Sequence, residues 1–93
     1  MKVKVRNLRS ENGNHVPNQF VIEAGDGVYF QSYETVIAKM PRRGKDTRVQ
    51  LDKDSWDYSR TTTKYLNQFL GTSGKKDIEE RIATKRYRLV SLN

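Results

Sequence analysis

An amphipathic stretch around residues 59–71 is the clearest pattern along this chain. Leu66, Phe69 and Leu70 recur at the i, i+3 and i+4 spacing that places side chains on one face of a helix. Ser59 is a residue type that caps helix N-termini, and Gly71 supplies the left-handed conformation that commonly ends a helix. The pattern predicts a helix from Ser59 to Leu70.

A second helix is predicted from Lys75 to Thr84. Ile78 and Ile82 lie four residues apart on one face, and charges are arranged to suit the helix dipole. Asp77 stands near the expected start and Arg81 near the expected end. The short segment 72–74 is read as a linker between the two helices.

The rest of the chain shows the two-residue alternation of half-buried strands. Met1, Val3 and Val5 alternate with cationic residues, which predicts a first strand with these three on its buried side. A polar loop is expected over 10–17, and the glycines around Asp26 indicate a tight hairpin. Further strands are expected over 19–24, 28–33, 47–51 and 87–92. Residues 35–39 form either a bulge or a separate strand.

These elements predict a single α+β domain over residues 1–93. The expected order is β-β-β-β-α-α-β, with a small antiparallel sheet and two helices on one of its faces. Several compact folds satisfy this pattern, and it does not fix the order of strands in the sheet.

Composition narrows the class of protein. The 93 residues are 34% hydrophobic and contain no cysteine, so a modest single core is expected without disulfides or thiolate metal sites. No apolar run approaches membrane-spanning length, and the N-terminus lacks the apolar core of a signal peptide. We therefore expect a cytoplasmic protein that has no membrane partner.

Catalytic and metal-binding patterns are missing. The one histidine, His15, stands in a polar loop, and no glycine-rich phosphate loop is present. Asp52, Asp54 and Asp57 are close in sequence, but acidic residues are expected just before a helix on structural grounds. The sequence predicts no enzyme activity, no cofactor and no metal.

The net charge of +7 indicates what kind of partner the protein binds, although it does not bear on the fold. Clustered Lys and Arg bind polyanions because they release counterions from phosphates. Such residues occur in a predicted turn, on the first helix and near the C-terminus. With Thr61, they make up the candidate set for binding nucleic acid or a protein partner: Arg42, Arg43, Lys45, Arg60, Thr61, Lys64, Lys85, Arg86 and Arg88.

Two features of this set remain open to a purely structural interpretation. Arg60, Thr61 and Lys64 suit an anion near a helix N-terminus, although the neighbouring threonines equally suit a half-buried helix face. The turn at 39–45 is either a projecting basic finger or an ordinary solvated turn.

Four tyrosines, Tyr29, Tyr33, Tyr58 and Tyr87, are candidates for stacking on the bases of single strands, and the alternative for each is ordinary packing in the sheet or core.

The runs FQSYETVIAKM, VQLDKDSWDYSRTTTKYLNQFLG and RYRLVSLN resemble small proteins encoded by bacteriophages and related mobile elements. The segment W-x-Y-S-x-T-T-x-K-Y followed by F-L-G is typical of them, and the likeness covers about residues 20–93. That family has no settled function, so the resemblance transfers no catalytic or binding residue. It implies expression in a bacterial host cell, where small phage proteins often act on host machinery or defences, including CRISPR systems.

Two functions are consistent with these observations. The first is a non-enzymatic phage-type accessory protein that binds nucleic acid or a host nucleic-acid-handling complex through basic surfaces. The second is an anti-CRISPR-like inhibitor of a host defence system that docks on an acidic host protein or a nucleoprotein. The sequence does not separate DNA from RNA, or single strands from duplexes.

Overall fold

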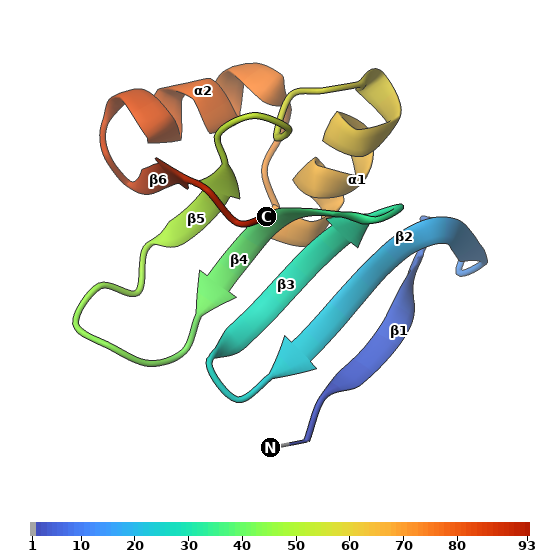
Figure 1. Ribbon diagram of the computed structural model, residues 1–93. Coiled ribbons are helices and arrows are strands. Elements are labelled where there is room, and N and C mark those ends of the chain that lie inside the picture. Colours follow the sequence, from blue (N-terminus) through green and yellow to red (C-terminus); the bar gives the residue numbers. More distant parts are fainter. Residues whose placement is uncertain (1) are drawn as a thin grey trace.

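Six strands and two helices build the molecule (Figure 1), and the computed structural model describes residues 2–93. The fold is α+β, as the sequence predicted. The elements in chain order are β1 (Lys4–Arg9), β2 (His15–Ala24), β3 (Gly27–Ser32), β4 (Thr35–Pro41), β5 (Val49–Asp52), α1 (Arg60–Leu70), α2 (Lys75–Ala83) and β6 (Tyr87–Val90).

All six strands lie in one sheet, in the order in which they occur along the chain. Neighbouring pairs from β1 to β5 are antiparallel, whereas β5 and β6 are parallel. The predicted antiparallel sheet is therefore confirmed for four of the five strand pairs, and the last pair departs from it. Its physical reason is the connection: both helices lie between β5 and β6, and such a crossover returns the chain in the direction in which it left.

Five strands precede the helices, one more than the predicted order contained. The additional strand is β4, so the second of the two interpretations of residues 35–39 is confirmed. A register shift between Phe30 and Gln31 on β3 also places an irregularity in the β3–β4 pair. Because of this irregularity, the consecutive residues Ile37 and Ala38 of β4 are both buried in the core.

The hairpin predicted around Asp26 is confirmed, with Ala24 paired to Gly27 across a two-residue turn. The backbone of β4 also lies close to Gly27, which is paired with Pro41. A Cβ atom at this position would lie 2.5 Å from the carbonyl oxygen of Met40, so only glycine fits without a backbone shift.

The N-terminal strands differ most from expectation. Val3 and Val5 are 56% and 60% exposed, and Leu8 is the buried residue of β1. The predicted position Met1 lies outside the described residues. The predicted loop 10–17 is shorter, because β2 already begins at His15. Since β1 lies at the edge of the sheet, only its C-terminal end, at Leu8, is buried.

The core joins the sheet to both helices. Phe30 of β3, Leu66 of α1 and Ile78 of α2 are fully buried in one cluster, to which Trp56 and Tyr87 also belong. The rings of Phe30 and Phe69 stack with centroids 5.6 Å apart.

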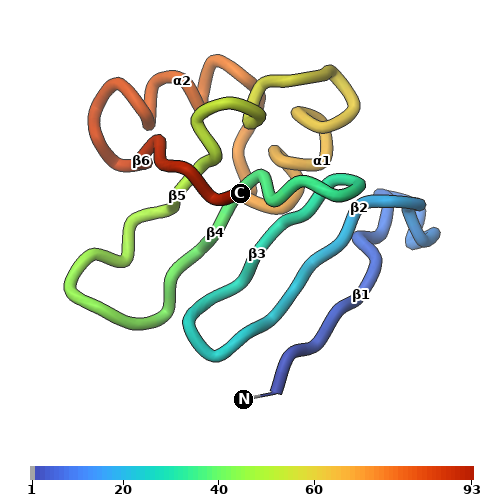
Figure 2. The backbone as a smooth tube through the Cα atoms, viewed as in Figure 1, coloured from blue at the N-terminus to red at the C-terminus, as the bar shows by residue number. Residues whose placement is uncertain are grey.

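The helices begin and end close to the predicted positions. Ser59 caps α1 by accepting a hydrogen bond from the amide of Thr62, and Gly71 ends it in the left-handed conformation. The chain then crosses to α2 and returns along β6 to the sheet (Figure 2). At the C-terminus, Asn93 exchanges two hydrogen bonds of 2.8 Å with the backbone of Val36. Among the described residues, no helix is long and apolar enough to cross a membrane.

Candidate nucleic-acid interface

The candidate cations, together with the nearby Arg48 and Lys75, divide into two separate groups. Seven cations, which we call the loop group, lie on the β4–β5 loop or at the start of β6: Arg42, Arg43, Lys45, Arg48, Lys85, Arg86 and Arg88. Three others, the helix group, lie at the starts of α1 and α2: Arg60, Lys64 and Lys75. β4 runs from the α1 end of the molecule to the loop, a span of about 20 Å. The structure therefore does not bring the two groups together (Figure 1).

Four of the seven cations in the loop group form ion pairs, with three carboxylates between them. Arg48 and Arg88 both contact Asp46, at 2.7 and 3.2 Å. Hydrogen bonds from Arg48 hold the pKa of Asp46 far below its ordinary value, so this carboxylate stays ionised.

The remaining ion pairs of the loop group involve Arg42 with Glu23 at 3.3 Å and Arg86 with Glu80 at 3.7 Å. Arg43, Lys45 and Lys85 form no ion pair within residues 2–93. An anion that binds here has to compete with the carboxylates already present.

The helix group is different, because none of its members forms an ion pair with another part of the chain that the structure describes. All three side chains line one shallow hollow of about 460 Å³, together with Asp57, Tyr58, Ser59 and Thr63. We call it the basic hollow. With three cations against the single carboxylate of Asp57, its net charge is positive. Lys64 additionally lies over the ring of Tyr65, 5.3 Å from its centroid.

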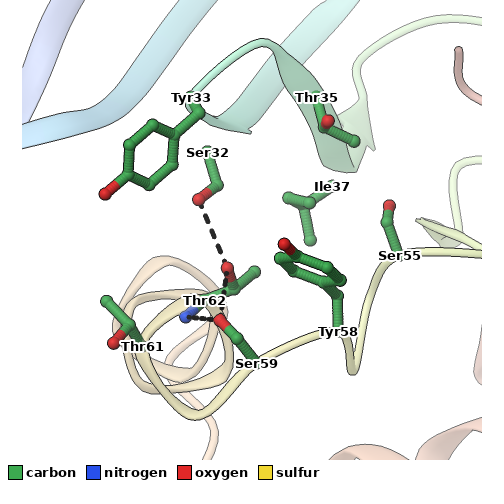
Figure 3. Close-up of a pocket in the computed structure, with 9 residues that line it drawn as sticks. All are labelled: Ser32, Tyr33, Thr35, Ile37, Ser55, Tyr58, Ser59, Thr61 and Thr62. Carbon is green, nitrogen blue, oxygen red and sulfur yellow. Dashed lines mark hydrogen bonds between the residues drawn. The ribbon is translucent and has the colours of Figure 1, made fainter.

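A second hollow, also of about 460 Å³, adjoins the first and shares Tyr58 and Ser59 with it. Figure 3 shows it between the β3–β4 turn and the segment that leads into α1. We call it the hydroxyl pocket, because eight of its nine lining residues carry a hydroxyl group. They are Ser32, Tyr33, Thr35, Ser55, Tyr58, Ser59, Thr61 and Thr62, and the ninth is Ile37.

Hydrogen bonds fix the floor of this pocket. The buried hydroxyls of Ser32 on β3 and Thr62 on α1 lie 3.3 Å apart. Ser59 donates to the Thr62 hydroxyl and accepts from the Thr62 amide, both at 3.0 Å. The middle threonine of the Thr61–Thr63 run is thus structural, and only Thr61 stays exposed at the pocket rim.

Two exposed tyrosines flank the pocket. Tyr58 is 78% exposed, and it follows the buried Trp56, which anchors the segment before α1. Tyr33 is 62% exposed and occupies the β3–β4 turn with φ of +54°, a conformation that non-glycine residues seldom adopt. The amide of Tyr33 donates to the carbonyl of Asn18, and this bond holds the turn in place.

The other two tyrosine candidates have structural roles. Tyr87 is buried in the core, so the second of its two interpretations, ordinary core packing, is the correct one. The hydroxyl of Tyr29 donates to Asp26, and Lys39 lies over its ring.

Asp52, one of the three aspartates considered for a metal, also has a structural role. It is buried, and it accepts hydrogen bonds from the amide of Leu92 at 2.9 Å and from the hydroxyl of Ser55. No three potential metal ligands of the His, Cys, Asp and Glu types converge within residues 2–93.

The pKa of Asp52 predicts a pH dependence of folding. Burial acts to raise this pKa, but hydrogen bonds from Leu92, Ser55 and Asn93 outweigh it and hold the pKa below 3.8. The ionised carboxylate therefore stabilises the fold above about pH 4, and this contribution is lost as the pH falls through the folded-state pKa. We expect Asp52→Asn to lower the free energy of unfolding by about 1.5–3 kcal/mol at pH 7. Urea denaturation should show a smaller difference in the free energy of unfolding between the parent and Asp52→Asn at pH 3 than at pH 7. A difference that does not change with pH would contradict this role.

Sequence reasoning named some of the residues that line the two hollows. It named Arg60, Thr61 and Lys64, and it proposed Tyr33 and Tyr58 for stacking. It missed Lys75, and it missed Ser32, Thr35 and Ser55, which reach the pocket from distant parts of the chain.

Comparison with known proteins adds one finding. The model of a family of unknown function (DUF8033) matches residues 3–85. No curated protein and no solved structure matches the chain.

Proposed function

Because the chain belongs to this family of unknown function, we propose from its surface that it is a non-enzymatic accessory protein of phage type that binds nucleic acid. The observation that carries the proposal is the basic hollow, where three cations without ion-pair partners in residues 2–93 line one concave surface. Lys and Arg side chains bind polyanions because they release counterions from the phosphates.

The composition of the hydroxyl pocket supports binding rather than catalysis. The hydroxyl pocket is lined by no histidine, lysine or carboxylate that would activate one of its hydroxyls as a nucleophile. His15 stands at the start of β2 and lines neither hollow.

Anisotropy of labelled single-stranded DNA, duplex DNA and RNA across a salt series tests the proposal. Three phosphate contacts predict that the logarithm of affinity falls linearly with the logarithm of salt concentration, with a slope of about −2 to −3. Weak binding at physiological salt for all three probes would contradict direct recognition of nucleic acid.

A second candidate function is inhibition of a host defence system by docking on an acidic protein or a nucleoprotein. The loop group favours it, because Arg43 and Lys45 are exposed on a loop at the far end of β4. Rim charges of this kind accelerate encounter with an acidic partner. Failure of the salt series with nucleic acid, combined with capture of an acidic host protein that depends on Arg43 and Lys45, would favour this alternative.

A further inference from the structure

The geometry points to a more specific ligand, and we propose that the hydroxyl pocket receives the base and sugar of one unpaired nucleotide while the basic hollow holds its phosphate. This inference rests on the proposed function and specifies the ligand of the same site. It makes the protein selective for single strands.

Segregation of charge between the two hollows is the first argument. Four of the eight hydroxyls of the pocket, those of Ser32, Ser55, Ser59 and Thr62, are hydrogen-bonded within the protein, and the other four form no hydrogen bond within residues 2–93. With no ionisable group other than tyrosine, the pocket suits a neutral, polar ligand. The basic hollow next to it carries Arg60, Lys64 and Lys75. A nucleotide has the same division into a neutral base with its sugar and an adjacent charged phosphate. The pocket volume of about 460 Å³ lies within the range of small-molecule sites.

The position of Tyr58 is the second argument. Its side chain lines both hollows and is 78% exposed, so a ligand that spans them has to pass this ring. In Figure 3, Tyr33 lies on the other side of the Ser32–Thr62 hydrogen bond from Tyr58. Exposed tyrosine rings provide stacking surfaces for bases of any sequence.

Backbone amides at the start of α1 provide further hydrogen-bond donors for the phosphate. The Ser59 cap uses the amide of Thr62, whereas the amides of Arg60 and Thr61 have no hydrogen-bond acceptor within residues 2–93. Arg60 lines the basic hollow and Thr61 lines the adjoining hydroxyl pocket, so a phosphate oxygen at the boundary of the two would accept from these amides.

Preference for single strands follows from access to the base. In a duplex, both faces of a base are stacked and its pairing edge is occupied, so it enters a pocket only after extrusion. An unpaired base reaches the pocket without that penalty. A free mononucleotide offers the same chemistry, and the experiment has to separate the two sources.

Binding of a labelled ten-nucleotide DNA strand, the corresponding duplex and adenosine monophosphate by Tyr58 variants tests the inference. Stacking on one tyrosine is worth about 1–3 kcal/mol, so Tyr58→Ala should weaken single-strand binding roughly 5- to 150-fold. The salt slope should stay unchanged, because the phosphate contacts remain. Tyr58→Phe keeps the ring and should bind nearly as the parent does, and duplex binding should not change in either variant. Tyr33→Ala should show a loss in the same direction.

The outcomes separate the two proposals. Parental affinity of Tyr58→Ala and Tyr33→Ala for the single strand would overturn the nucleotide pocket and leave nucleic-acid binding in place. Equal losses for single strand and duplex would overturn it as well. If the parent binds neither polymer, nucleic-acid binding fails, and calorimetry with adenosine monophosphate decides the pocket. Adenosine monophosphate binding that is lost in Tyr58→Ala but kept in Tyr58→Phe would support the nucleotide pocket. If the parent protein does not bind adenosine monophosphate, the pocket is overturned. Because both tyrosines are exposed, thermal unfolding should confirm that every variant is folded.

Discussion

Leu66→Ala is expected to lower the free energy of unfolding by about 2–5 kcal/mol, the range for a buried leucine truncated to alanine. Leu66 is fully buried at the centre of the cluster that joins the sheet to the two helices. The substitution leaves a cavity in this cluster. Its neighbours in the cluster are equally buried and leave little room for the structure to collapse into that cavity; they include Phe30, Leu51 and Ile78. Urea denaturation monitored through the nearby Trp56 measures the change.

Leu89→Ala provides a matched control, since it removes the same atoms from a leucine that is 44% exposed on β6. We expect it to lower the free energy of unfolding by less than about 1 kcal/mol, because little apolar surface returns to water. Equal effects of the two substitutions would mean that α1 presents a different face to the core.

The helices could be predicted closely because their signals are local. The Ser59 cap, the Gly71 stop and the spacing of Leu66 and Phe69 all lie within the thirteen residues from 59 to 71. A helix satisfies its own backbone hydrogen bonds, so its position does not depend on distant partners.

The strands could be predicted less well, since their burial depends on neighbouring strands, some of them remote in sequence. Val3 and Val5 have the alternation of a half-buried strand, yet they are exposed because β1 forms the edge of the sheet. The parallel pairing of β5 and β6 likewise depends on where the helical crossover returns the chain. No pattern within either strand contains that information.

The same distinction applies to the candidate interface. Arg60, Thr61 and Lys64 share one helix, so their proximity follows from helical spacing alone. The hydroxyl pocket combines Ser32 and Thr35 with Ser55, three residues that only tertiary structure brings together. The loop group shows the opposite effect: its cations are dense in sequence, but carboxylates from other elements neutralise several of them.

Replacing Arg60 and Lys64 together by glutamine tests whether the helix group is the phosphate site. Each lost phosphate contact should reduce the magnitude of the salt slope by about 0.9, so the double variant should lose about 1.8. At 0.1 M salt this corresponds to an affinity for duplex DNA lower by roughly 60-fold. Glutamine preserves helix propensity, and both side chains are exposed, so the melting temperature should change little. Anisotropy titrations at four or more salt concentrations give both the slope and the affinity.

The matched control replaces Arg43 and Lys45 by glutamine. It removes the same charge from exposed positions that also have no ion pair within residues 2–93, but at the other end of β4. We expect a loss of less than tenfold. Similar losses in both double variants would indicate a diffuse attraction to the whole cationic surface, and a loss confined to the Arg43 and Lys45 variant would assign the contact to the loop group. Only a selective loss at Arg60 and Lys64 is consistent with a phosphate held beside Tyr58, because the basic hollow is the one that shares this residue with the hydroxyl pocket.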